Sequence, residues 1–119
     1  MTVVIIGASD NSERYSYKAA EALLKNGFDI ALVGIKNKTV FGHPIRSSIP
    51  MIEEDTIVTL YVGPQNQDSF VSEILRLNPS KVIFNPGTEN PSLQEILNSH
   101  HIKWEEACTL VKLSLKQFP

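Results

Sequence analysis

The sequence predicts an α/β fold in which helices cover both faces of a five-stranded parallel sheet. Short apolar runs typical of buried strands alternate along the 119 residues with segments whose apolar residues repeat at helical spacing. The first run, Val3 to Ile6, contains only β-branched residues and leads directly into Gly7. Such a run is expected for a strand that is buried on both sides, as in a parallel sheet.

The remaining elements follow in the same alternating order. Strands are predicted at residues 3–6, 28–33, 56–62, 81–84 and 102–104. Helices are predicted in three places. One lies around residues 19–24 and ends at Gly27, and one lies around residues 70–75 and ends near Pro79. The last runs from Pro91 to about Leu97, with Asn90 as its cap. Residues 34–50 are rich in Gly and Pro and are interpreted as turns, and the tail from Cys108 is ambiguous between helix and coil. This pattern predicts a Rossmann-like three-layer fold, with residues 1–119 as a single domain.

Composition argues against several classes of partner. The net charge is −2 and no block of Lys or Arg is present, so no nucleic-acid partner is expected. The longest apolar runs are far below the ~18 residues of a membrane span, and the prediction is a soluble, cytoplasmic protein. Cys108 is the only cysteine, which excludes an internal disulfide, and the three histidines lack metal-ligand spacing. No metal site is predicted.

A ligand site is expected at the carboxyl ends of the strands, where parallel sheets of this kind bind their ligands. Four turns would meet at that edge: residues 7–9, 34–36, 62–64 and 85–87. Each of them contains a glycine, which permits close approach of a backbone to a ligand.

The first of these turns, Gly7-Ala8-Ser9, has two interpretations. It lacks the further glycines of a dinucleotide-binding GxGxxG loop. The Ser9 hydroxyl, the positive end of the next helix, and Arg14 and Ser16 at the helix entrance would suit a phosphate. Alternatively, Gly7 only makes a tight turn and Arg14 is a solvated surface charge. A β-carbon at Gly7 would enter the ligand space or force the turn out of its backbone conformation. If the turn serves a ligand, Gly7→Ala should damage binding more than folding.

Residues 7–33 resemble the first βαβ unit of stand-alone CoA-binding domain proteins, a family similar to the CoA-binding domain of the succinyl-CoA synthetase alpha subunit. The family pattern is Gly-Ala-Ser, a short loop, Arg-x-Ser-Tyr, a helix that ends in Gly, and a second strand. The matching positions in this sequence are Gly7-Ala8-Ser9, Arg14, Ser16-Tyr17, Gly27 and residues 28–33.

The resemblance continues toward the C-terminus with two departures. The family's Asn-Pro-Lys after the second strand is Gly34-Ile35-Lys36 here, so that only the lysine is retained. Gly87 matches the glycine of a Gln-x-Gly pattern, in which Asn85 corresponds to the glutamine only by analogy, and Cys108 matches a cysteine near the family's C-terminal end. The resemblance implies coenzyme A or an acyl-CoA as the cofactor. The binding residues that it implies are Gly7, Ala8, Ser9, Arg14, Ser16, Lys36, Val62, Pro64 and Gly87.

The residue after the second strand also bears on the choice of ligand. NAD sites place an acidic residue there for the ribose hydroxyls, whereas this chain has Lys36, which favours a phosphate. CoA and NADP both carry such a phosphate. No catalytic residue is predicted, because the histidines show no nucleophile pattern and a lone cysteine is more often a small buried residue. The predicted function is a CoA-binding module without chemistry of its own; the alternatives are an NADP-dependent oxidoreductase, an enzyme subunit with the same site, or a fold retained for protein contacts. Assembly with copies of itself or with a partner protein is left open.

Overall fold

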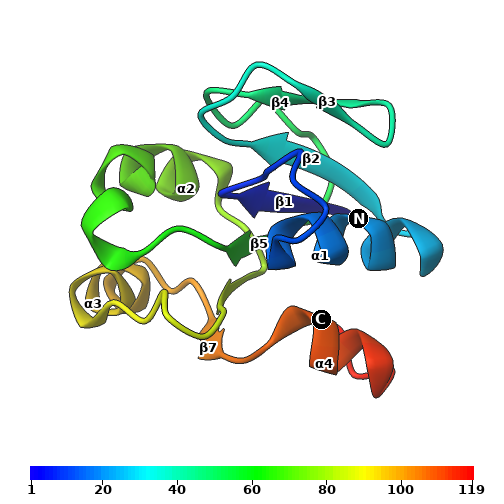
Figure 1. Ribbon diagram of the computed structural model, residues 1–119. Helices are drawn as coiled ribbons and strands as arrows, with labels where there is room; N and C mark the ends of the chain where they lie inside the picture. Colours follow the sequence, from blue (N-terminus) through cyan, green and yellow to red (C-terminus); the bar gives the residue numbers. More distant parts are fainter.

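The computed structural model describes residues 1–119 and contains one seven-stranded sheet with helices on both faces (Figure 1). The strand order is β3-β4-β2-β1-β5-β6-β7, and every neighbouring pair is parallel except β3 with β4. The strands are β1 (Thr2–Ile6), β2 (Asp29–Val33), β3 (Thr39–Val40), β4 (His43–Arg46), β5 (Thr56–Leu60), β6 (Lys81–Phe84) and β7 (Trp104–Glu106). The predicted Rossmann-like α/β class is confirmed.

The predicted number of five strands is wrong, because the turn-rich segment forms a hairpin at the edge of the sheet. Strands β3 and β4 are joined by Phe41 and Gly42, with φ of 51° and 78°. Positive φ at both central residues is typical of a type I′ turn, which joins the strands of a two-residue hairpin, so these turn residues connect a strand pair. Only Val40 and Ile45 of these strands are buried hydrophobic residues, which is too few for a recognisable strand pattern.

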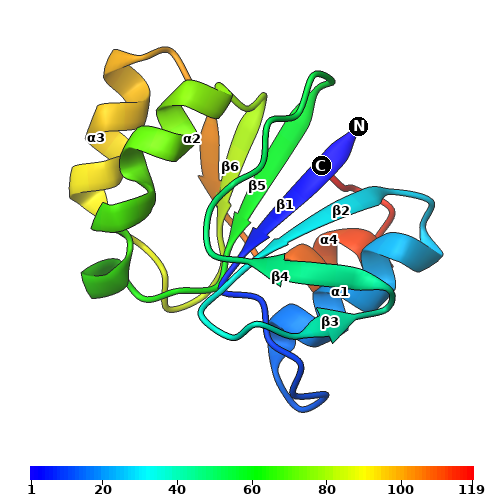
Figure 2. The same ribbon diagram turned by 90° about the horizontal axis from the view of Figure 1, so that it is seen from above.

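Helices form the two outer layers (Figure 2). They are α1 (Tyr15–Lys25), α2 (Val71–Leu77), α3 (Pro91–Ser99) and α4 (Thr109–Ser114), and two 3₁₀ turns, η1 (Pro64–Asn66) and η2 (Asp68–Phe70), precede α2. Helices α2 and α3 lie on one face of the sheet, and α1 and α4 lie on the other. No helix is both long and apolar enough to cross a membrane.

The core is divided by the sheet, as the alternation of side chains along β1 shows. Val4 and Ile6 pack in the cluster that contains Ile74 of α2 and Leu97 of α3. Val3 and Ile5 pack on the opposite side in the cluster that contains α1 and α4 residues. Because successive side chains of a strand point to opposite faces, a strand buried on both sides is nearly continuously apolar. The exceptions in β5, Thr56 and Thr59, are buried polar residues.

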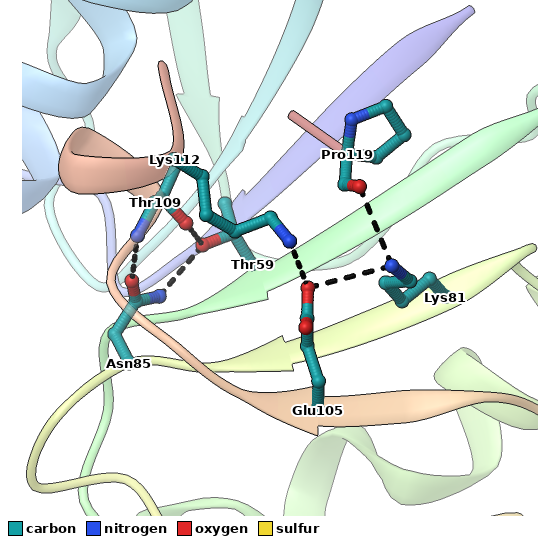
Figure 3. A network of polar contacts seen from close by, with 7 residues as sticks. All are labelled: Thr59, Lys81, Asn85, Glu105, Thr109, Lys112 and Pro119. Atoms are coloured by element: carbon teal, nitrogen blue, oxygen red, sulfur yellow. Dashed lines mark hydrogen bonds and ion pairs between the residues drawn. The ribbon is translucent and has the colours of Figure 1, made fainter. Parts of the chain in front are cut away.

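Residues Thr109–Ser114 of the ambiguous tail form a helix, α4, which is held by contacts from segments distant in the chain (Figure 3). Lys112 of α4 and Lys81 of β6 both donate to Glu105 of β7, Lys81 at 3.4 Å. The backbone N–H of Thr109, at the start of α4, donates to Asn85 Oδ1 at 2.9 Å. Strand β7 also starts two residues later than predicted, since Ile102 packs into the core before the strand begins.

Candidate functional site

A cleft of about 880 Å³ lies at the carboxyl ends of β1, β2, β5 and β6. In the sheet, β2 lies on one side of β1, whereas β5, β6 and β7 lie on the other side. The direction in which the chain adds strands therefore reverses at β1. Sheets of this type bind ligands at such a switch point. All the residues predicted from the sequence line this cleft except Pro64, which starts η1: Gly7, Ala8, Ser9, Arg14, Ser16, Lys36, Val62 and Gly87.

Gly7 brings the ends of β1, β2 and β5 together. The N–H groups of Gly7 and Ala8 both donate to Val33 O, at 2.8 and 2.9 Å. Neither N–H group is therefore available to bind a ligand. The φ of Gly7 is +98°, and a β-carbon there would lie 2.8 Å from the carbonyl carbon and oxygen of Tyr61. Of the two outcomes expected for a β-carbon at Gly7, entry into the ligand space is therefore wrong, because the atom would meet the backbone that follows β5. The geometry agrees with the other outcome, in which the turn is forced out of its conformation.

The loop after this turn is ordered by its own side chains. Ser9 Oγ accepts from Asn11 N at 3.0 Å, and Asn11 Oδ1 accepts from Glu13 N at 2.9 Å. Arg14 occupies the N-cap position of α1 without capping it through its side chain. The N–H groups of the first turn of a helix have no partner within the helix, so the positive end of α1 remains open beside the cleft.

Charge is distributed unevenly along the cleft. The basic residues, Arg14 and Lys36, come from the α1 entrance and from the end of β2, and the acidic residue Asp68 comes from η2 after β5. Lys36 Nζ lies 3.9 Å from Asp10 Oδ1, with the lysine side chain 61% exposed. An exposed pair at this distance contributes little, so Lys36 can exchange Asp10 for an anion at a small cost in free energy. The β1–β2 half is thus basic and the β5–β6 half is neutral to acidic.

Several lining residues were not identified from the sequence. Gly34 and Ile35 lie within a turn already placed at this edge, whereas Gln65, Asn66, Asp68, Ser69 and Phe70 belong to η1 and η2. Short 3₁₀ turns have no apolar periodicity by which a sequence reveals them. Their position directly after β5 is the only feature that could have placed them at the cleft.

Asn85 does not serve the cleft, contrary to the analogy drawn from the sequence. Its side chain is buried, donates to Thr59 Oγ1 at 2.7 Å and accepts from Thr109 N (Figure 3). It also donates to Leu60 O at 2.8 Å. Both polar ends of the amide are therefore occupied by the scaffold.

Tyr61 is one of the residues that line the cleft, and its side chain packs against the core cluster that contains residues of α1 and α4. The Oη atom is buried without a hydrogen-bond partner. Burial raises the pKa of the Tyr61 phenol to about 12. The phenol is therefore neutral over the physiological range and adds no charge to the cleft.

The family model for a CoA binding domain matches residues 1–114. The chain belongs to the CoA-binding domain family. A solved crystal structure of an uncharacterized protein is 46% identical, with a TM-score of 0.94, and the alignment covers 98% of this chain and 97% of the other. Comparison with curated protein sequences finds no match.

Two further structures share the fold of this CoA-binding domain. A Thermus thermophilus protein is 20% identical with a TM-score of 0.86, and the match covers 98% of this chain and 90% of that protein. A hypothetical protein from Pyrococcus horikoshii OT3 is 23% identical with a TM-score of 0.85, and the match covers 95% of this chain and 81% of that protein.

Proposed function

We propose that this CoA-binding domain binds coenzyme A or an acyl-CoA in the cleft at the switch point of the sheet. The observation that carries the proposal is that Arg14 and Lys36 line the same cleft as the uncapped start of α1. A helix N-terminus with two basic side chains suits phosphate oxygens, of which CoA has several. Membership of the CoA-binding domain family supports CoA as the molecule that carries these phosphates.

The charge distribution suggests how CoA lies. Its phosphates belong in the basic β1–β2 half, against Arg14 and Lys36. Its pantetheine arm, which carries two amides on an uncharged chain, then extends toward the β5–β6 half. There Gln65, Asn66 and Phe70 offer amide groups and an apolar ring.

We assign the domain a binding role without a reaction of its own. The charged side chains lining the cleft are Arg14, Lys36 and Asp68. None of them is hydrogen-bonded to a serine, cysteine or histidine, the arrangement that activates a nucleophile. The single cysteine, Cys108, is not among the lining residues.

A thermal-unfolding series with CoA, acetyl-CoA and NADP tests the ligand. A ligand that binds only the native state stabilises it by about 2.7 kcal/mol at a hundredfold excess over its Kd. CoA or acetyl-CoA should raise the melting temperature in a concentration-dependent manner. A rise with NADP and none with either CoA compound would replace the proposal with the nicotinamide alternative.

Two substitutions test the phosphate half of the site. Arg14→Ala and Lys36→Ala each remove a charge-assisted contact worth about 1.5–3 kcal/mol, so the affinity for CoA should fall at least tenfold in isothermal titration. Added salt should weaken the wild type more than either variant. Lys25→Ala is the matched control, since Lys25 is an exposed lysine that pairs with Glu21 at the other end of α1. Variants that bind as tightly as the control would reduce Arg14 and Lys36 to surface charges.

A further inference from the structure

Gln67 is a fully buried polar side chain beside the cleft that does not line it. It lies between η1 and η2, and its side chain is 0% exposed. Nothing in the sequence singles it out, because it stands in a polar run, QNQDS, that is typical of a surface loop. A buried amide costs free energy unless its donors and acceptor are all bonded, which makes its partners informative.

The partners of Gln67 come from two separate strand-end loops. Its Nε2 donates to Val62 O, after β5, at 3.0 Å and to Thr88 O, after β6, at 2.7 Å. Its Oε1 accepts from Asn90 Nδ2 at 2.9 Å. Asn90 in turn caps α3 by accepting from Leu93 N at 3.3 Å. The carbonyls of Val62 and Thr88 at one end of this series of bonds fix the orientation of the Gln67 amide, and the N–H of Leu93 at the other end fixes that of Asn90.

Val62 and Thr88 both line the cleft, together with Gly87 beside Thr88. The bonds from one buried amide therefore hold the two loops that form the β5–β6 half of the cleft. Arg14 and Lys36 lie outside these loops, and neither is hydrogen-bonded to this network.

We propose that Gln67 is a positioning residue that sets the spacing of the Val62 and Thr88 loops, and thereby the fit of the pantetheine arm. This inference rests on the proposed CoA function and on the orientation assigned to CoA above. It separates two parts of the ligand: affinity for the arm depends on Gln67, whereas affinity for the phosphorylated nucleoside does not.

The test compares CoA with adenosine 3′,5′-bisphosphate, which lacks the pantetheine arm. Gln67→Met keeps the length of the side chain but leaves two carbonyls and one amide without partners. We expect it to lower the affinity for CoA at least tenfold and to leave the affinity for the bisphosphate within about twofold. The control is Ile57→Val, a core change near the start of β5 that destabilises the fold away from the cleft. Unchanged CoA affinity, or an equal loss for both ligands, would overturn the proposal.

A second variant covers the case in which Gln67→Met does not fold. Gln67→Glu places a carboxyl against the carbonyls of Val62 and Thr88, and only its protonated form can donate to either of them. Its CoA affinity relative to the wild type should rise as the pH falls from about 8 to about 5.5. A ratio that does not change with pH would contradict the role of the donated hydrogen bonds.

Failure of the proposed function gives a different result. A wild-type protein that binds neither CoA nor the bisphosphate would refute the CoA assignment. The tie between the loops is then measured without ligand, by hydrogen exchange of the Thr88 N–H, which bonds to Asn85 O at 3.0 Å. Faster exchange in Gln67→Met than in Ile57→Val supports the tie, and equal exchange overturns it.

Discussion

Gly7→Ala is expected to destabilise the fold strongly, and the structure shows two independent reasons. The φ of +98° is rarely adopted by residues with a side chain, and such backbone strain costs about 1–3 kcal/mol. The added β-carbon would also lie 2.8 Å from the backbone of Tyr61, which belongs to a neighbouring loop and cannot rotate away as a side chain can. Overpacking of this kind costs about 1–3 kcal/mol more.

The two contributions together give a loss of about 2–6 kcal/mol, against a total stability of about 5–15 kcal/mol for a typical domain. Gly87→Ala is the matched control. Its φ is +92°, but a β-carbon there would have no atom within 4 Å, so it carries only the backbone strain of about 1–3 kcal/mol. Urea unfolding of the wild type and both variants measures the difference. The reasoning is refuted if Gly7→Ala loses no more stability than Gly87→Ala.

Three further predictions concern charge. Lys112, bonded to Glu105, holds the pKa of that carboxyl below its ordinary 4.5; the stabilisation is present above about pH 4.5 and lost as the pH falls through the lowered pKa. Unfolding measured against pH should show that loss in the wild type and not in Glu105→Gln, with less than about 1 kcal/mol at stake because Glu105 is 33% exposed. Tyr61 has its pKa raised from 10.0 to about 12, so the wild type should lose stability above about pH 10 relative to Tyr61→Phe. Asp10→Asn should raise CoA affinity about two- to fivefold in titration by releasing Lys36, and unchanged affinity would show that the pair does not compete with the ligand.

The elements recognised from the sequence are those whose signals are local. Val3 to Ile6 lie in β1 as predicted, because a strand covered on both faces is nearly continuously apolar, and the strand begins one residue earlier, at Thr2. Asn90 caps α3 with Pro91 at its first position, since both preferences act within one turn of helix. The edge of the sheet that holds the cleft also followed from the alternation of strands and helices, because parallel strands all end on the same side.

The tertiary structure decided which residues that are distant in the chain lie in contact. Gly7 serves the approach of β1 to Tyr61, Asn85 holds the start of α4, and Gln67 joins Val62 to Thr88. A glycine or an amide in a loop has the same local signature whether it faces a ligand, solvent or another loop. Its role depends on which backbone groups the fold brings within about 3 Å, and that distance is set by the packing of strands rather than by neighbouring residues.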